Sequence, residues 1–331
     1  MSERGVAVCI VTWNSAGDLR RCFECVAAQR HRPLEVVVVD CGSTDDSAAR
    51  AGDLELGSLP RSVVPLGENR GFSGGMNEAI RRSSSPLLVT LNPDAWPEPD
   101  FVSRLVERLE GAAGWRVGAV AGRLVRPEES GARRLDACGM RLAPSWRHLD
   151  RGSREVDRGQ WSEAERVFGA TGAASLFVRR ALQDVAVDGE VFDTRFHSYR
   201  EDAELCFRLR ERGWEVLYEP RALAVHRRRV DPSNRSELPW EINYHSLKNR
   251  YLLRAYHQTA GNLLRTLLPT LARDLGALAY VAARERTSLA AYAWLWRHRR
   301  EIIARRRTIQ SRRSVPPGAV EVWFREAGLP L

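Results

Sequence analysis

The first 125 residues alternate short apolar runs with amphipathic segments, and this alternation constrains the fold more than any other feature. Residues 33–40, "PLEVVVVD", place four valines before an aspartate, which is typical of a strand covered on both faces. Residues 6–13 and 86–94 have the same character, and residues 18–29 repeat apolar side chains at helical spacing. The rhythm predicts an α/β fold with a mostly parallel sheet, helices on both faces, and ligands at the carboxyl ends of the strands.

The alternation breaks at residues 126–166, which are polar, arginine-rich and interrupted by glycine and proline. It returns as a strand and a helix in residues 169–182, a helix near 197–214, and two strands at 215–220 and 222–226. The remainder of the chain has a helical pattern rich in arginine, leucine and tryptophan.

We therefore expect two parts, an α/β domain of residues 1–235 and an arginine-rich helical extension of residues 236–331. The domain would have two halves, residues 1–125 and 126–235. The longest uncharged run of the extension, residues 275–283, is too short to span a membrane. Basic helices with aromatic residues suit either a membrane interface or a surface packed on the domain.

The net charge and the cysteines narrow the range of partners. A formal charge of +9 favours an anionic ligand or membrane surface, whereas scattered arginines without an aromatic stacking motif argue against nucleic acid. Cys22 and Cys25 fall within a helical pattern, so we expect them to pack in the core rather than bind a metal. The N-terminus has no secretory signal, and we expect a cytoplasmic protein.

Polar residues follow four of the predicted strands: Thr12 and Asn14, Asp40, a loop at 67–77, and residues 92–94. Because the carboxyl ends of parallel strands share one edge of a sheet, we expect these residues to converge. The loop has three glycines before a predicted helix, so its backbone could approach a phosphate closely. It matches neither the P-loop nor the dinucleotide fingerprint, which argues against an ATPase and a dehydrogenase.

Asp94 stands where an apolar strand runs into a proline-rich exit, which we expect to end the sheet and leave the carboxylate accessible. One carboxylate, together with diphosphate oxygens and water, suits a hard divalent cation. Asn-Pro-Asp is also common turn chemistry, so Asp94 could instead stabilise a local turn.

The helical segment that begins near residue 197 carries a second group of candidates. Ser198 and Glu201 match the S-x-x-E pattern of a capping box, which would give Glu201 a structural role. Asp202 would lie in the first helical turn, as a general base at the lip of a cleft or as compensation for the helix dipole. His226 ends the last predicted strand beside arginines 227–229, where it could bind a metal or be structural.

Seven motifs in a fixed order resemble the family 2 glycosyltransferases, which have the nucleotide-diphospho-sugar transferase (GT-A) fold, and above all their rhamnosyltransferase-like members. They cover about residues 6–228 and read "VTWN", "VVVVDCGSTDDS", "ENRGFSGGMN", "LNPDAW", "GAASLFVRR", "EDAELCFRLRERGW" and "YEPRALAVH". The resemblance implies that Asp40 binds the nucleotide base and that Asp202 is the catalytic base. It also implies that Asp94 and His226 hold Mg²⁺ or Mn²⁺. Asn92 departs from the family's D-x-D metal motif and leaves less negative charge around the ion.

The activity that the resemblance implies is that of an inverting, metal-dependent hexosyltransferase. Thr12 and Asn14 would bind the nucleoside with Asp40, and the glycine-rich loop would cover the diphosphate and the donor sugar. The further donor-side residues would be Asn69, Gly71, Ser73, Gly74, Asn77 and Asn92. The acceptor-side residues would be Tyr199, Glu201 and Trp214.

The resemblance favours dTDP-L-rhamnose as the donor, and a hydroxyl of a cell-envelope glycan or lipid-linked saccharide as the acceptor. UDP-hexoses and galactofuranose remain alternatives, because the motifs do not specify the sugar. The basic C-terminal helices would contact the inner face of the cytoplasmic membrane as a peripheral protein, or form the interface of a homodimer.

Two rival classes are a sugar-nucleotide nucleotidyltransferase and a non-catalytic basic protein that binds RNA or an anionic membrane. The first would carry a basic glycine-rich loop in the first turn, which "VTWNSAGDL" lacks. The second rests on the net charge alone.

Overall fold

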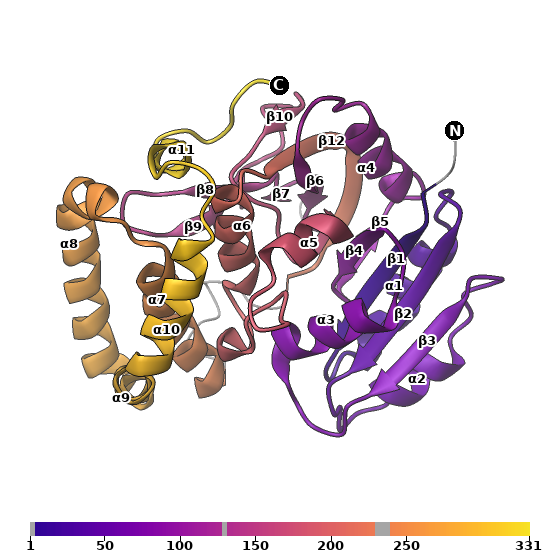
Figure 1. The fold of residues 1–331 in the computed structure, drawn as a ribbon. Helices are drawn as coiled ribbons and strands as arrows, with labels where there is room; N and C mark the ends of the chain where they lie inside the picture. Colours follow the sequence, from indigo (N-terminus) through magenta and orange to yellow (C-terminus); the bar gives the residue numbers. More distant parts are fainter. Residues whose placement is uncertain (1–3, 128–130, 229–238) are drawn as a thin grey trace.

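The computed structural model describes residues 4–127, 131–228 and 239–331. Its centre is one mixed sheet that runs in the order β10-β12-β6-β11-β4-β1-β2-β3 (Figure 1). The main strands are β1 (Val6–Thr12), β2 (Leu34–Asp40), β3 (Arg61–Pro65), β4 (Leu87–Leu91), β6 (Val117–Val125), β11 (Ala174–Val178) and β12 (Glu215–His226). All pair in parallel except β11, which lies antiparallel between β4 and β6. The predicted α/β class with a mostly parallel sheet is confirmed.

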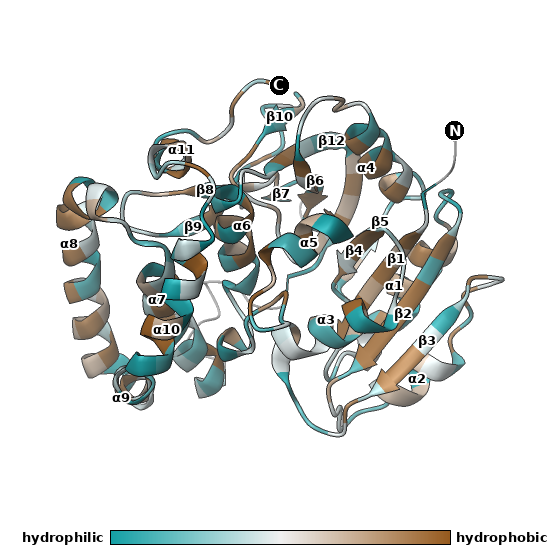
Figure 2. Ribbon diagram, in the orientation of Figure 1, coloured by the Kyte–Doolittle hydropathy of each residue, from teal (hydrophilic) through white to brown (hydrophobic). Residues whose placement is uncertain are grey.

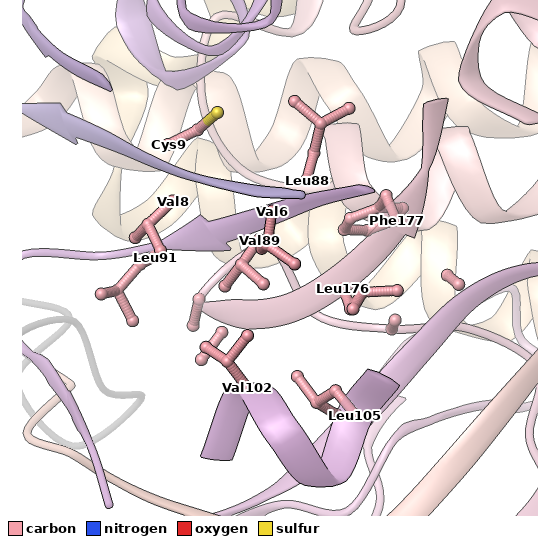
Figure 3. Close-up of a cluster of buried hydrophobic side chains, with 14 of the residues drawn as sticks. Val6, Val8, Cys9, Leu88, Val89, Leu91, Val102, Leu105, Leu176 and Phe177 are labelled. Atoms are coloured by element: carbon pink, nitrogen blue, oxygen red, sulfur yellow. The ribbon is translucent and has the colours of Figure 1, made fainter. Parts of the chain in front are cut away.

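Helices cover both faces of this sheet (Figure 1). They are α1 (Ala16–Ala27), α2 (Ser47–Asp53), α3 (Gly71–Arg82), α4 (Phe101–Glu110), α5 (Arg179–Val185) and α6 (Glu201–Glu211). Val102 and Leu105 of α4 point at one face of the strands, whereas Cys9 points away from it (Figure 3). On that opposite face α3 lies close to β1, because a side chain at Gly75 would come within 2.6 Å of Val11. Burial on both faces explains the continuous apolar run of β2, visible in Figure 2.

The described part of residues 126–166 forms short strands, two of which join the main sheet and two of which pair as a separate two-stranded sheet, where only a break in the pattern was predicted. They contribute β7 (Leu135–Ala137), β8 (Met140–Leu142), β9 (His148–Asp150) and β10 (Glu165–Arg166). β7 pairs with β6, and β10 pairs with β12. The segment is therefore part of the core architecture.

Three boundaries differ from the prediction. The proline-rich exit after Asp94 does not end the sheet, because β5 (Ala95–Pro97) pairs antiparallel with β12. Residues 215–226 form one strand, bulged between Glu219 and Leu223, rather than two. The helix α3 already begins at Gly71, so most of the predicted loop is helical. Gly71 permits this start through its φ of 66°, since a Cβ there would lie 2.4 Å from the His197 carbonyl oxygen.

The C-terminal residues form helices that gather on one side of α6 (Figure 1). They are α7 (Trp240–His257), α8 (Ala260–Arg284), η3 (Arg286–Leu289), α9 (Ala290–Arg297), α10 (Arg299–Ser311), α11 (Gly318–Glu321) and η4 (Val322–Phe324). A second hydrophobic core joins them to residues 140–207, with Trp146, Phe207 and Phe324 in mutual contact. The proposed boundary at 235–236 lies outside the described residues and stays a prediction.

Two further features bear on the predictions made from composition. Within the described ranges, no helix combines the length and the apolar character needed to cross a bilayer. Cys22 is buried and Cys25 is half-buried on α1, and both are free thiols. Burial raises the pKa of each thiol, which agrees with a packing role.

Candidate active site

A pocket of about 480 Å³ opens where β4 and β12 end and α6 begins. Asp94, Asp202 and His226 all line it, so the fold brings together three residues that lie far apart in the sequence. Asn92, Tyr199 and Glu201 also line it, as do Asp150 and Arg228. The pocket thus collects carboxylates, a histidine and an arginine at the edge of the sheet where parallel strands end.

The pairing of β5 with β12 sets Asp94 beside His226. Ala95 is the register partner of His226, and the Arg227 amide donates a hydrogen bond to the Asp94 carbonyl oxygen at 2.9 Å. His226 Nε2 consequently lies 3.4 Å from Asp94 Oδ1. On the other side of the ring, Nδ1 lies 2.7 Å from Asp136 Oδ2. Each ring nitrogen of the imidazole therefore faces a carboxylate.

Asp136 is fully buried on β7 and is surrounded by positive charge. Its Oδ1 lies 3.0 Å from Arg228 Nε and 3.3 Å from Arg126 Nε. Burial opposes ionisation of Asp136, but His226 and these arginines lower its pKa. Burial likewise disfavours the charged imidazole, yet Asp136 and Asp94 together raise the pKa of His226 to about 9. The two carboxylates therefore favour the protonated form of the His226 imidazole.

The same arrangement fits a divalent cation. Among the described residues no group of three or more histidine, cysteine or acidic side chains could hold a metal. Asp94 and His226 Nε2 supply two ligands, and Asp136 fixes the ring as outer carboxylates do in metal sites. Few protein ligands beside an open pocket suit an ion that shares its coordination with phosphate oxygens.

Asp202 lies in the first turn of α6 and is bound by backbone amides. The Gly172 N–H donates to its Oδ2 at 3.1 Å, and the Ala203 N–H donates to its Oδ1 at 2.7 Å. Burial is the main cause that raises its pKa to about 6, and the charge of Asp150 adds to it. A carboxylate with this pKa is ionised near neutral pH and can take up a proton.

The predicted capping box is wrong. Arg200, with φ of 73°, is the N-cap residue of α6, and no side chain caps the helix there. The Ser198 hydroxyl instead accepts a hydrogen bond from the Phe72 amide of α3 at 3.2 Å. Glu201 lines the pocket, and burial, with the charge of Asp202 adding to it, raises its pKa well above the usual range.

The segment before α6 has unusual backbone geometry. His197, Tyr199 and Arg200 have φ angles of 63°, 71° and 73°, which are costly for residues other than glycine. Asn249 of α7 holds this segment, because its Nδ2 lies 2.8, 2.8 and 2.7 Å from the carbonyl oxygens of Phe196, Ser198 and Tyr199. The C-terminal helices thus secure the turn that presents Asp202.

The predicted nucleoside residues lie together at the ends of β1 and β2. Thr12 and Asp40 are register partners, and Asp40 accepts hydrogen bonds from the Ser43 amide at 3.1 Å and hydroxyl at 2.5 Å. Asn14 Oδ1 accepts from the Thr44 amide at 2.8 Å. The Thr12 hydroxyl is buried and has no hydrogen-bond partner among the described residues. None of these residues lines the 480 Å³ pocket.

Phe72 of the glycine-rich segment lines the pocket, but the predicted donor-side residues of the segment contact other parts of the protein instead. The Gly71 amide donates to Asn69 Oδ1, and the Ser73 amide donates to the His197 carbonyl oxygen. The Ser73 hydroxyl is buried, and Gly74 packs on Arg70. The side chain of Asn77 donates a hydrogen bond to the Phe192 carbonyl oxygen and accepts hydrogen bonds from the amides of Val191 and Phe192. The first amides of α3 are therefore not directed at a phosphate here, contrary to the expectation for a loop.

Trp214, which was predicted on the acceptor side, lies outside the 480 Å³ pocket. Its indole is buried beyond α6, donates to Asp184 at 2.7 Å, and is covered by the guanidinium of Arg116. A tryptophan at the end of a helix can pack inside the protein or contact a ligand, and the sequence alone does not distinguish the two roles.

Sequence reasoning missed Asp136 and Asp150. Both come from residues 126–166, where a lone acidic residue in a polar stretch gives no signal. Asp136 contacts His226 across 90 residues of sequence, and Asp150 forms an ion pair with Arg228. Only the antiparallel addition of β7 to β6 brings Asp136 to the site.

The mostly parallel sheet with helices on both faces has the GT-A-like fold, and its pocket combines a paired carboxylate and histidine with a separate carboxylate of raised pKa. Residues 7–185, more than half of the chain, match the family described as glycosyl transferase family 2. The chain belongs to this family and is a glycosyltransferase, as its resemblance to the family predicted.

Relatives and solved structures agree with this assignment. An N-acetylglucosaminyl-diphospho-decaprenol L-rhamnosyltransferase from Mycobacterium tuberculosis is 27% identical over 251 residues, covering 66% of this chain and 75% of the relative. An N-acetylglucosaminyltransferase from Azorhizobium caulinodans is 27% identical over 234 residues, covering 66% of this chain and 54% of the relative. A mannosyltransferase from Pyrobaculum calidifontis, solved with GDP-Man and Mn²⁺, superposes with a TM-score of 0.54 at 20% identity, over 98% of this chain and 88% of the other, and supports the fold.

Proposed function

We propose that this glycosyltransferase is inverting and metal-dependent, and that it moves a sugar from a nucleotide diphosphate to a hydroxyl of a cell-envelope glycan or lipid-linked saccharide. The observation that carries the proposal is that Asp202, with its pKa raised to about 6, shares one pocket with the Asp94–His226 pair. Asp202 is suited to take a proton, and the Asp94–His226 pair is suited to bind a cation.

Asp202 would act as the general base. As the acceptor hydroxyl oxygen attacks the anomeric carbon, its proton passes to the Asp202 carboxylate. The bond from that carbon to the diphosphate oxygen breaks, and the electron pair leaves with the diphosphate. Displacement in one step inverts the anomeric carbon and needs one base, unlike the paired carboxylates of a glycoside hydrolase.

Asp94 and His226 would hold Mg²⁺ or Mn²⁺ through a carboxylate oxygen and Nε2. When bound, the ion supplies positive charge to the diphosphate on which negative charge develops. Asn92 lines the same pocket and adds a neutral amide where the usual motif of the family has a carboxylate. Arg228 adds a fixed positive charge to the pocket wall.

Asp40, Thr12 and Asn14 would bind the nucleoside. Their support is their common position at the ends of β1 and β2, together with the buried Thr12 hydroxyl that lacks a partner among the described residues. The Asp40 carboxylate could accept a hydrogen bond from N3–H of a pyrimidine. We favour dTDP-L-rhamnose, because the chain resembles rhamnosyltransferases and a relative is named as one. UDP-linked hexoses and galactofuranose are the alternatives.

The extension of residues 236–331 would place the enzyme on an anionic membrane surface. Leucines 264, 268, 271, 275 and 278 recur at intervals of four and three on α8, and Leu264 is 79% exposed. Trp296 on α9 is 69% exposed, Arg297 follows it, and the Arg299 guanidinium carbon lies 4.4 Å from the centroid of its ring. A basic helical surface with an apolar stripe suits the interface of a bilayer. A homodimer interface is the alternative use of the stripe.

A thermal-shift screen tests the proposal. The purified protein is heated with dTDP-L-rhamnose, UDP-glucose, UDP-galactofuranose or GDP-mannose, each with and without Mn²⁺. We expect selective stabilisation by one pyrimidine nucleotide sugar, and only a weak effect when the cation is omitted. Retention of RNA without any response to sugar nucleotides would favour the non-catalytic alternative. Two measurements distinguish the alternatives for the leucine stripe of α8. Sedimentation with anionic vesicles would support the membrane surface, and a dimer in solution would support the homodimer interface.

A further inference from the structure

A second pocket, of about 430 Å³, lies beside the active-site pocket. The two share Arg200 and Ser246 as common lining residues. The rest of the second pocket is lined by α7 and α8, including Arg250, Arg273 and Tyr280. Neither the proposed metal site nor the proposed nucleoside site uses it.

The second pocket concentrates positive charge. Arg200, Arg250 and Arg273 line it. Asp274 forms an ion pair with Arg250 at 2.9 Å and a second ion pair with Arg254 at 2.5 Å. Nε of Arg200 and Nε of Arg273 are buried without a hydrogen-bond partner among the described residues. One carboxylate is therefore shared between two arginines, and guanidinium donors remain available for an anion.

The pKa values reflect this crowding. Burial, together with the charges of Arg250, Arg273 and Arg147, lowers the pKa of Arg200 to about 9. Burial and the charges of Arg250 and Arg147 lower the pKa of Arg273 to about 10. Each arginine is less easily charged than in water, as expected for a site whose counter-ion is a ligand.

We propose that the second pocket binds the diphosphate of a lipid-linked acceptor, and that this contact directs the acceptor sugar toward Asp202. This inference rests on the proposed glycosyl transfer. Guanidinium groups bind phosphate oxygens in pairs, and three arginines around one pocket match a ligand with two phosphates. The donor diphosphate would lie at Asp94 and His226, so the arginines serve a second anionic ligand.

Two features connect this pocket to catalysis and to the lipid. Arg200 is in the shared wall and lies two residues before Asp202, so a phosphate on Arg200 lies next to the base. Gly276 and Ala277 of α8 line the pocket, while Leu275 and Leu278 beside them are exposed. A hydrocarbon chain attached to the bound diphosphate would leave along the leucine stripe of α8.

The experiment compares Arg273→Gln with Arg284→Gln in the full chain. Arg273 is half-buried in the pocket, whereas Arg284 is an exposed arginine near the end of the same helix, away from the pocket. The acceptors are a polyprenyl-diphosphate saccharide and the same saccharide without the diphosphate. We expect Arg273→Gln to raise KM for the diphosphate acceptor about tenfold or more, since a charge-assisted hydrogen bond is lost. KM for the donor and turnover of the acceptor without diphosphate should not change, and Arg284→Gln should match the wild type.

A second measurement separates this inference from the proposed transfer. Binding of inorganic diphosphate is followed by calorimetry in the absence of divalent cations, and we expect it to be weakened about tenfold by Arg273→Gln only. If the wild type transfers no sugar but shows this difference, the transfer proposal fails and the phosphate site stands. Equal diphosphate binding by wild type and Arg273→Gln overturns the site. Loss of binding to phosphatidylglycerol vesicles with an unchanged acceptor KM also overturns it, because the phosphate would then belong to a membrane lipid.

Discussion

The two halves of the catalytic region hold their functional residues in different ways. In the nucleotide half, Asp40 and Asn69 are held locally, by Ser43 three residues later and by Gly71 two residues later, although Asn77 reaches residues 191–192. In the acceptor half the contacts are long-range, since His226 contacts Asp136 across 90 residues and Asn249 of α7, in the C-terminal extension, holds Ser198 across 51. Local contacts are fixed as soon as a strand and its turn form. Long-range contacts depend on the completed sheet and on the C-terminal helices.

The largest expected effect is that of Asp202→Asn in the acceptor half. Turnover should fall by about 10²–10⁴-fold, because the substituted amide cannot accept the acceptor proton. Stabilisation by the nucleotide sugar should persist, since the nucleoside residues lie in the other half. Steady-state transfer and thermal shift measure the two quantities on the same protein.

Glu201→Gln is the matched control for that variant. Glu201 lines the same pocket, and because burial raises its pKa and so favours the neutral carboxyl, glutamine is the conservative substitution there. It should lose at most a few-fold in turnover. If the two variants lose the same activity, Asp202 is not the base.

The next effect tests the long-range contact to the metal site. Asp136→Asn should weaken activation by Mn²⁺ about 10–100-fold, because the group that orients His226 is changed while Asp94 and His226 remain. Excess Mn²⁺ should restore turnover, whereas for Asp94→Asn it should restore much less. A titration of activity against Mn²⁺ measures both.

Asp157→Asn serves as the control from the same segment. Asp157 pairs with Arg123 and does not line the pocket. An equal loss of Mn²⁺ activation in this variant would mean that Asp136 acts through folding of residues 126–166 and not through His226.

These contacts also explain what the sequence could and could not predict. The strand rhythm predicted the α/β class, and Asp94, Asp202 and His226 could be named as candidates because each stands at the end of a strand or the start of a helix. Asp136 lies in a three-residue strand without a periodic pattern, so only tertiary pairing reveals it. Trp214 and Asn77 have the right composition for recognition, but their contacts with Asp184 and with residues 191–192 depend on packing. The loop prediction at 67–77 failed because Gly71 starts a helix against His197.

A smaller effect compares two asparagines, Asn77 in the nucleotide half and Asn249 in the C-terminal extension that holds the acceptor half. Asn249 bonds three carbonyl oxygens of the strained turn before Asp202, and Asn77 bonds the backbone of residues 191–192. Each change to alanine should lower the free energy of unfolding by about 1–3 kcal/mol. Only Asn249→Ala should also lower kcat, about tenfold, because the base loses its position. Denaturant unfolding and steady-state kinetics separate the effects, and a raised donor KM in Asn77→Ala would restore its predicted donor role.

The smallest effect is on pH dependence, and it follows from the pKa of Asp202, raised from 3.8 to about 6. Activity should halve near pH 6 and fall about tenfold per unit below it, since the protonated carboxyl cannot act as a base.

Stability changes in the opposite direction. Because the folded state binds the proton more tightly than the unfolded state, the contribution of Asp202 to stability is lost as pH rises from about 4 to about 6. Asp202→Asn stays neutral, so at pH 7 its free energy of unfolding should exceed that of the wild type by at most about 3 kcal/mol, and it should unfold at a higher temperature. At pH 4 the two proteins should unfold at a similar temperature. A wild type that is equally active at pH 5 and pH 7, or a variant that is less stable at pH 7, would show that Asp202 does not titrate as the pocket requires.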